Sequence, residues 1–276
     1  MIENEQNNPL LPSDESEDIV QVVLKDLKVE YSKVTDILSL NTEELSEKDK
    51  FDIIKFSIKV NADQDYQWEV YRKQSEIKKN FAQIQTELSS RNMTPTGEKA
   101  TIFSNVANWS EDSFQLHILD IQNYYTTLFQ DSEIYNTLAL KEFFNISVES
   151  FNKNNNGKKP FEGCILKRAQ PQLLRSLIRF ICFPIECLFF KKYNNRWFII
   201  KDDCIYYMNL STSKIKKNIY FFDKGSEVKK EWKDTIWIRI GHRSFTLKFK
   251  TIFEREIWYM EITNRINAFK NKSNYI

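Results

Sequence analysis

The chain has 276 residues, of which 41% are hydrophobic and 14% aromatic, and this is enough apolar material for the cores of one or two domains. The four cysteines form no CxxC pair and only two histidines are present, which argues against a zinc site, and no cofactor is predicted. The N-terminus is polar and acidic rather than charged and then apolar, so no secretory signal is indicated and a cytoplasmic protein is expected.

The formal charge of +2 conceals an uneven distribution along the chain. Residues 1–156 carry 15 Lys and Arg against 27 Asp and Glu, a net charge of −12, whereas residues 157–276 carry 25 against 11, a net charge of +14. A strongly basic half favours an anionic partner, either phospholipid or nucleic acid.

The first half is predicted to begin with three strands. Apolar and β-branched residues predict strands over residues 19–29, 51–60 and 66–73. Residues 61–65 ("NADQD") have turn-forming side chains, so the second and third strands are expected to form a hairpin.

Helical periodicity dominates the rest of this half. A helix is predicted after the third strand, with one apolar face formed by Ile77, Phe81, Ile84 and Leu88. The following residues 91–110 contain Gly and Pro without a sustained period and are predicted to be a long loop. Two further helical stretches are predicted over residues 111–130 and 133–146.

The second half is predicted to be rich in strands and to end in one helix. Residues 151–160 are polar and rich in breakers where the charge changes sign, which indicates a linker between domains. Six short aromatic and β-branched runs separated by polar turns then predict strands. The C-terminal helix has one face formed by Trp258, Ile262, Ile266 and Phe269. Such an arrangement is typical of a small barrel or bent sandwich capped by a helix.

Three features of the second half, the stretches "EGCILKR" and "RWFIIKDDCIYYM" and Trp258 in the last helix, together resemble a pleckstrin-homology (PH) domain over residues 161–269. "EGCILKR" is similar to the first strand of that family, and "RWFIIKDDCIYYM" to its second and third strands. Trp258 lies where the family keeps a single tryptophan in its last helix. The stretches "FFDKGSEVK" and "IWIRIGHRSFTLKFK" are similar to the PH domain of phospholipase D.

The first half resembles a phox-homology (PX) domain, in its order of strands, helices and long loop and in the closing segment "IYNTLALKEFFNIS". A PX domain followed by a PH domain is the N-terminal arrangement of one class of phospholipase D. The resemblance implies an α+β fold, with a PX-like three-stranded sheet and helical subdomain followed by a PH-like barrel or sandwich capped by a C-terminal helix. The expected boundaries are a disordered acidic tail over 1–16, a PX-like domain over 17–150, a linker over 151–160 and a PH-like domain over 161–270.

The resemblance implies a weak phosphoinositide site in the PX-like half, at Arg72 and Lys73. Lys73 lies where the family places a phosphate-contacting residue, but Gln74 replaces the aromatic residue that stacks on the inositol ring. His117 lies at or near the position of a later arginine. A phosphate pocket needs paired cationic donors, so weak or absent binding is expected on this acidic half.

In the PH-like half, the resemblance implies that a phosphorylated inositol is held by Lys167, near the end of the first strand, and Arg196, at the start of the second. Asn194 replaces a lysine that is common in the family. Substitute charge is expected from Arg168, Lys191 and Lys192. The alternative interpretation is that all of these are ordinary solvated surface cations.

The most apolar stretch, "LLRSLIRFICFPIECLFF" over residues 173–190, falls in the loop that joins the first two PH-like strands. Charged residues interrupt it, so it does not provide the roughly 20 apolar residues of a spanning helix. It is predicted to be an amphipathic loop insertion that contacts a membrane through Leu174, Arg175, Leu177, Ile178, Arg179, Ile181 and Phe183. In related phospholipase D proteins this loop carries acylated cysteines, so the resemblance makes Cys182 and Cys187 candidate palmitoylation sites. The alternative is an interface helix packed on the PX-like half or on an absent domain.

The chain is expected to be non-catalytic. Phospholipase D catalysis uses two copies of His-x-Lys-x4-Asp, but His117 is followed two residues on by Leu119, and His242 by Ser244. The predicted function is a phospholipid- and phosphoinositide-binding module that targets membranes peripherally from the cytoplasm. It is expected to be either part of a larger phospholipase D or a separate regulatory protein.

Two other functions are alternatives to this prediction. One is a PX-PH adaptor that binds other proteins and has only incidental affinity for lipid. The other is a nucleic-acid binder that uses the +14 surface, which is disfavoured because the strand-borne aromatics read as core and no recognition motif accompanies the charge.

Overall fold

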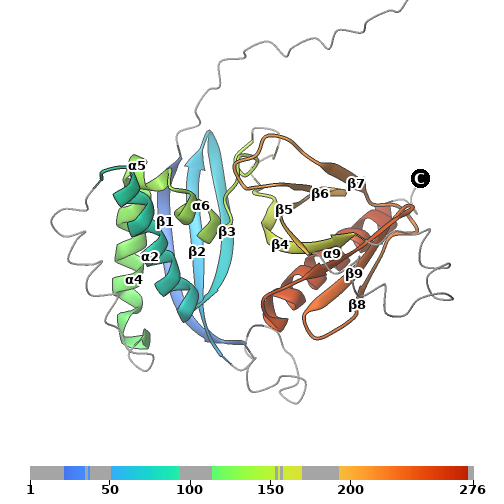
Figure 1. Cartoon of the computed structure of the whole chain (residues 1–276), viewed down its shortest axis with the longest axis horizontal. Helices are drawn as coiled ribbons and strands as arrows, with labels where there is room; N and C mark the ends of the chain where they lie inside the picture. The colour runs from blue at the N-terminus through green and yellow to red at the C-terminus, as the bar shows by residue number, and fades with distance from the viewer. Residues whose placement is uncertain are drawn as a thin grey trace, which may run out of the picture.

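The computed structural model describes residues 22–34, 37, 51–93, 114–152, 155, 158–169 and 193–272. Two units lie side by side, a three-stranded sheet with helices and a seven-stranded sheet with a C-terminal helix (Figure 1). This arrangement confirms the predicted α+β fold, a PX-like unit followed by a PH-like unit. The predicted acidic tail over residues 1–16 lies outside the described residues.

The PX-like sheet is antiparallel, in the order β1 (Val23–Lys33), β2 (Asp52–Ala62) and β3 (Gln64–Lys73). The hairpin between β2 and β3 turns at Asp63, whose φ of 68° is one that Asp tolerates better than most residues. The three predicted strands are therefore present. The first of them ends four residues later than predicted, at Lys33.

The helices of this unit are α2 (Gln74–Ser90), the short 3-10 helix η3 (Phe114–His117), α4 (Ile118–Gln130), α5 (Ser132–Tyr135) and α6 (Leu138–Phe143). The sheet and the helices meet at Phe56, whose ring lies edge-on to those of Tyr125, Phe143 and Phe144 at 5.4–5.5 Å between centroids. The stretch 133–146, predicted as continuously helical, is divided into α5 and α6. The division arises because the hydroxyl of Thr137 accepts the backbone N–H of Leu140 and so caps a new helix.

The PH-like sheet has seven antiparallel strands in the order β7-β6-β5-β4-β10-β9-β8. The strands are β4 (Phe161–Ala169), β5 (Asn194–Lys201), β6 (Cys204–Met208), β7 (Asn218–Phe221), β8 (Glu227–Lys230), β9 (Thr235–Ile240) and β10 (Arg243–Lys248). The helix α9 (Ile252–Lys272) buries Trp258, Ile262 and Ile266 against this sheet, as its periodicity predicted. Strand β8 was not among the six predicted strands, because its sequence EVKK is mostly charged and it lies at an edge.

The described residues next to the start of β4 pack against both units. Lys159 Nζ lies 2.7 Å from Oε1 of Glu162 and faces the ring of Trp68 in the PX-like unit. Glu162 also accepts hydrogen bonds from Ser150 and from Trp197 Nε1 of β5, the latter at 2.8 Å. A buried ion pair with these additional hydrogen bonds joins the units at one end of their interface.

A second contact joins the units at the start of α9. Ile252 and Phe253 form an apolar cluster with Val34 and Ile53 of the PX-like unit, and the ring of Phe253 lies 5.6 Å from that of Tyr71. Both contacts pack side chains of one unit against side chains of the other. No helix in the described ranges is long and apolar enough to cross a bilayer.

Candidate functional site

The pairing of β4 with β5 places Lys167 and Arg196 on the same face of the PH-like sheet. In the antiparallel register Lys167 lies opposite Asn194, and Ile165 lies opposite Arg196. Directly opposed residues and every second residue of a strand project to one face. That face is the inner one, because Ile165 belongs to the buried core. Lys167 and Arg196 therefore lie at an end of this core, which we call the mouth.

The side chain of Lys167 is enclosed by aromatic rings, and only 8% of the residue is exposed. Its Nζ lies 3.8 Å from the centroid of Tyr207 and 5.0 Å from that of Phe245, and it donates a hydrogen bond of 3.3 Å to the hydroxyl of Tyr220. Burial lowers the pKa of Lys167, its interaction with Tyr207 raises it, and the charges of Arg196 and Arg243 lower it further. The ammonium is thus held in a site that only partly compensates its lost hydration.

The pKa values of Tyr207 and Tyr220, the two tyrosines next to Lys167 at the mouth, shift in opposite directions. Burial alone would raise the pKa of Tyr207, but the Lys167 ammonium and the hydrogen bond from Asn218, 2.6 Å to the phenol oxygen, lower it. Burial raises the pKa of Tyr220 to about 12. Tyr220 thus keeps its proton at neutral pH and can donate a hydrogen bond.

Arg243 is a third cation at the mouth. It shares the inner face of β10 with Phe245, two residues on, whose ring lies 5.2 Å from that of Tyr220. Within the described ranges, none of Lys167, Arg196 and Arg243 forms an ion pair with a carboxylate. Three cations without acidic partners therefore converge on one end of the sheet.

Sequence reasoning identified only part of this group. Lys167 and Arg196 were predicted, whereas Asn218, Tyr207, Tyr220 and Arg243 were not. The tyrosines read as ordinary core residues, and Arg243 read as part of a turn. Alternation along β7 and β10 could have placed Tyr220 and Arg243 on the inner face once the strand order was known.

The other predicted PH-like residues are not placed at the mouth. Arg168, which neighbours Lys167, points to the opposite face, where its guanidinium lies 5.3 Å from the ring centroid of Tyr193. Lys191 and Lys192 lie outside the described residues. The same holds for the whole 173–190 segment, with its predicted membrane-contact residues and with Cys182 and Cys187.

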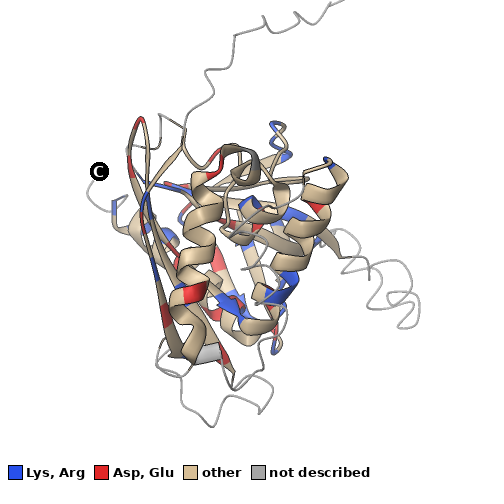
Figure 2. Cartoon of the chain, turned by 90° about the vertical axis from the view of Figure 1, so that its left-hand side faces the viewer, with Lys and Arg blue, Asp and Glu red and all other residues tan. Residues whose placement is uncertain are grey.

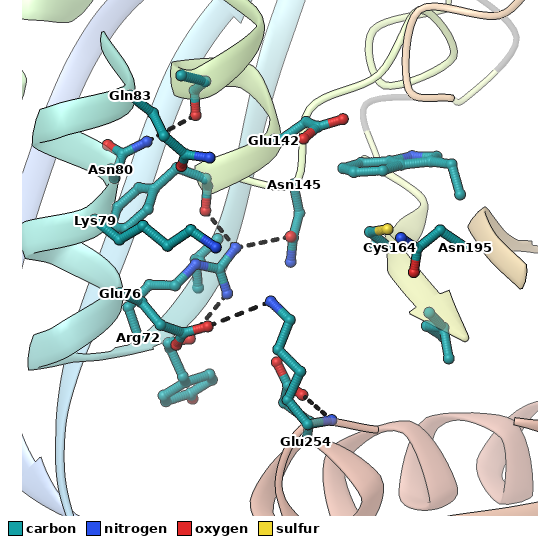
Figure 3. A pocket seen from close by; sticks show the side chains of 18 of the residues that line it. Arg72, Glu76, Lys79, Asn80, Gln83, Glu142, Asn145, Cys164, Asn195 and Glu254 are labelled. Atoms are coloured by element: carbon teal, nitrogen blue, oxygen red, sulfur yellow. Dashed lines mark hydrogen bonds and ion pairs between the residues drawn. The ribbon is translucent and has the colours of Figure 1, made fainter. Parts of the chain in front are cut away.

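Arg72 is used inside the protein. It donates hydrogen bonds to the carbonyl oxygens of Tyr71 and Phe143 and to Oδ1 of Asn145, the last at 2.8 Å (Figure 3). Burial lowers the pKa of Arg72, and the nearby carboxylate of Glu76 raises it. These partners give Arg72 a role in joining β3 to the end of α6.

Lys73 lies at the start of α2, with its Nζ 3.3 Å from the ring centroid of Phe51. His117, at the start of α4, lies 2.9 Å from Oδ2 of Asp120 through its Nδ1. Each of these two residues therefore faces a partner within the PX-like unit, unlike the cations that converge at the mouth.

A cavity of about 810 Å³ lies between the two units (Figure 3). Its lining includes Arg72 and Lys250, but also Glu76, Glu142 and Glu254. Lys250 Nζ lies 3.6 Å from Oε1 of Glu76, so the cavity walls carry both signs of charge. This mixture makes the cavity a poorer anion site than the mouth.

In the view onto the PX-like helices, basic and acidic residues are interspersed along the elements (Figure 2). The described residues contain no group of three or more metal-ligating side chains.

Comparisons with known proteins extend these observations. No protein-family model matches the chain. Phospholipase D2 from Bos taurus is 29% identical over 148 residues, which are 52% of this chain and 15% of that protein. This similarity, together with the observed order of elements, supports the predicted likeness to the PX-PH region of phospholipase D.

Two solved structures are similar at low TM-score. The tandem PX-PH domains of Bem3 from Saccharomyces cerevisiae give a TM-score of 0.25 at 12% identity, over 84% of this chain and 92% of that one. A structure of Vav1 inhibited by an allosteric inhibitor gives 0.30 at 11% identity, over 67% of this chain and 45% of that one.

Proposed function

We propose that the chain is a non-catalytic regulatory module that binds anionic membrane lipid, and that its mouth holds the phosphorylated inositol headgroup. One observation carries this proposal: Lys167, Arg196 and Arg243 converge at the mouth with no carboxylate partner among the described residues. Phosphate groups accept several charge-assisted hydrogen bonds, which are about twice as strong as neutral ones. The similarity to phospholipase D2 is consistent with a role beside a phospholipase.

The chemistry of the mouth favours an inositol phosphate over a bare anion. The hydroxyl of Tyr220 and the amide of Asn218 are polar groups that can meet ring hydroxyls, while the arginines meet phosphates. An approaching phosphate would also stabilise the charged form of Lys167, whose pKa is lowered by burial. The bound state would therefore gain a favourable interaction with Lys167 that the free protein lacks.

The PX-like unit contributes little to this proposed binding. Arg72 already donates to three acceptors of the protein, and Lys73 is the remaining predicted cation of that site. Gln74 offers no ring on which an inositol could stack.

Co-sedimentation with vesicles tests the proposal. Purified protein would be mixed with phosphatidylcholine vesicles with and without phosphatidylinositol 4,5-bisphosphate, at low and at physiological salt. Replacing both Arg196 and Arg243 with Ala is expected to weaken binding about 100-fold, since each lost charged hydrogen bond contributes roughly 1.5–3 kcal/mol. Lys233→Ala, an exposed cation at the distant β8–β9 turn, is the control. Unchanged binding by the double variant would reject the mouth as the lipid site and favour the adaptor function.

The 173–190 segment supplies a further part of the proposal, because in the sequence it lies between β4 and β5, the strands that carry Lys167 and Arg196. Its mixed basic and apolar residues are suited to the boundary between headgroups and acyl chains. Replacing Cys182 and Cys187 with Ser is expected to abolish acyl labelling of the chain in cells. Retained labelling would mean that neither cysteine is the principal acylation site.

A further inference from the structure

Exposed apolar side chains gather on one short stretch of the PH-like unit. Of the ten large hydrophobic residues that are strongly exposed in the described ranges, four lie within residues 210–221: Leu210, Ile215, Ile219 and Phe221. Ile215 is 67% exposed and Phe221 is 64% exposed. Large apolar side chains that are exposed so near one another in the chain indicate a surface that contacts a partner or a membrane.

The exposure follows from the position of β7 at the edge of the sheet. This strand pairs only with β6, with Ile219 opposite Tyr206 and Phe221 opposite Cys204. The alternation of β7 turns Tyr220 inward to the mouth and leaves Ile219 and Phe221 on the outer face. One strand thus contributes to the mouth on its inner face and to an exposed apolar row on its outer face.

The charges along this stretch are all of one sign. Residues 204–222 contain no Asp or Glu, but they contain Lys214, Lys216 and Lys217. Lys216 lies 3.2 Å from Glu149, while Lys214 and Lys217 are exposed beside Ile215 and Ile219. Lysine interleaved with exposed isoleucine suits an anionic bilayer surface, where the cations meet headgroups and the apolar side chains enter the boundary below them.

The loop that carries these residues is held in place. Ser211 donates a hydrogen bond to Glu142 through its hydroxyl and accepts the N–H of Val148 through its carbonyl. At its other end, Asn218 donates to the phenol oxygen of Tyr207 in the wall of the mouth. The loop is therefore anchored between the PX-like unit and the mouth, so its exposed residues keep a fixed position beside the mouth.

Acidic residues limit which end of β7 can approach a bilayer. The carbonyl of Asp203 accepts the N–H of Phe222, which places the Asp202–Asp203 turn beside Phe221. Asp223 lies at the same end of the strand. An anionic surface would repel this end and attract the end that carries Ile215 and Lys217.

We infer that residues 210–219 form a second membrane-contact surface, which binds an anionic phospholipid bilayer. These residues are the loop before β7 and the first residues of that strand. This surface needs no phosphoinositide. The inference rests on the proposed function in one respect only: a headgroup bound at the mouth would bring the bilayer to the same side of the molecule.

The test uses the full chain and a matched pair of double variants. Ile215→Ser with Ile219→Ser removes two exposed apolar residues of the surface, and Leu119→Ser with Met260→Ser removes two exposed apolar residues elsewhere. Each would be co-sedimented with phosphatidylcholine vesicles that contain phosphatidylserine, with and without phosphatidylinositol 4,5-bisphosphate. Circular dichroism melts check that each variant is folded, and sedimentation velocity without vesicles reports the oligomeric state.

The surface variant is expected to bind phosphatidylserine vesicles at least about tenfold more weakly than the wild type, because its two serines cannot enter the apolar boundary below the headgroups. The Leu119 and Met260 variant is expected to bind as the wild type does. Replacing Arg196 and Arg243 with Ala should instead remove the additional binding caused by phosphoinositide. The surface variant is judged by binding to phosphatidylserine, and the Arg196 and Arg243 variant by the additional binding that phosphoinositide causes. The proposal for the surface and the proposal for the mouth can therefore fail independently.

Three results would overturn the inference. The first is equal phosphatidylserine binding by the wild type and the Ile215 and Ile219 variant. The second is no binding of the wild type to any vesicle. The third is a wild-type dimer that the same variant converts to a monomer, because the surface would then be covered by a second copy of the chain.

Discussion

The ammonium of Lys159 lies 2.7 Å from Oε1 of Glu162, and both side chains are almost completely buried. This pair lies at the junction of the two units, within and next to the segment predicted as a linker. Glu162 also accepts Trp197 Nε1 from β5, and Lys159 faces Trp68 of β3. Burial lowers the pKa of Lys159, and Glu162 raises it. Because the pair contacts side chains of both units, we expect it to couple the stability of the PX-like unit to that of the PH-like unit.

Replacing Glu162 with Ala is expected to destabilise the protein by about 3–5 kcal/mol, because it leaves a buried ammonium without its partner. Urea unfolding followed by tryptophan fluorescence measures this change. Glu227→Ala is the control, since it breaks the more exposed Glu227–Arg239 pair and is expected to cost less than about 1 kcal/mol. Equal losses for the two variants would mean that the buried pair does not couple the units.

Periodicity predicted the elements of the fold where one face of a strand or helix is buried. The strands of the PX-like sheet and the apolar face of α9 were predicted because each element carries its own periodic pattern of apolar residues, with the spacing of a strand or of a helix. The break between α5 and α6 was missed because it depends on one hydroxyl, that of Thr137. Strand β8 was missed because an exposed edge strand has no apolar pattern to detect.

Residues of the candidate site could be predicted only where they lie on strands that follow one another in the sequence. Lys167 and Arg196 lie on strands that are consecutive in the chain, and their common face follows from simple pairing. Arg243 comes from β10, which pairs with β4 across a long separation in sequence. The role of Arg72 depends on the carbonyl of Phe143, 71 residues away, which no local pattern shows.

Replacing Lys167 with Met is expected to weaken lipid binding while leaving the stability of the protein nearly unchanged. The ammonium lies among the rings of Tyr207, Tyr220 and Phe245, so a side chain of similar length without charge fills the same space. Removing a partly desolvated charge should leave the free energy of unfolding within about 1 kcal/mol of the wild-type value. Binding to phosphoinositide vesicles should fall about tenfold or more, through loss of a charged hydrogen bond. A stable variant with undiminished binding would show that Lys167 is only a core residue.

Arg72 and Lys73 are adjacent, but substitutions of the two residues are expected to change the stability of the protein by different amounts. Arg72→Lys should cost about 2–4 kcal/mol, because an ammonium cannot reproduce the fork that reaches Phe143 and Asn145 together. Lys73→Ala removes a cation–π contact with Phe51 and should cost less than about 1 kcal/mol. Thermal unfolding and vesicle binding of both variants check this. A large loss of lipid binding in Lys73→Ala would mean that the PX-like unit binds headgroups after all.

The carboxyl of Glu254, in the cavity between the units, gives the chain a testable dependence on pH. Burial raises its pKa above 4.5, and so does Glu76, while Lys250 and Arg72 act in the opposite direction. In the window from 4.5 up to the raised value the folded protein binds more protons than the unfolded chain, so this carboxyl lowers stability as pH rises. Above the window the cost is complete, and below 4.5 it is absent.

Glu254→Gln is therefore expected to be more stable than the wild type at neutral pH and to match it in acid. The amide oxygen of the variant can still accept the backbone N–H of Lys250, which now bonds to Oε2 at 3.0 Å. Thermal melts between about pH 4 and 8 measure the difference, and it should grow through the window and then remain constant. Glu227→Gln on the exposed edge controls for the loss of one negative charge. A Glu254→Gln variant that is less stable at neutral pH would mean that the carboxylate's attraction to Lys250 and Arg72 outweighs the cost of its burial.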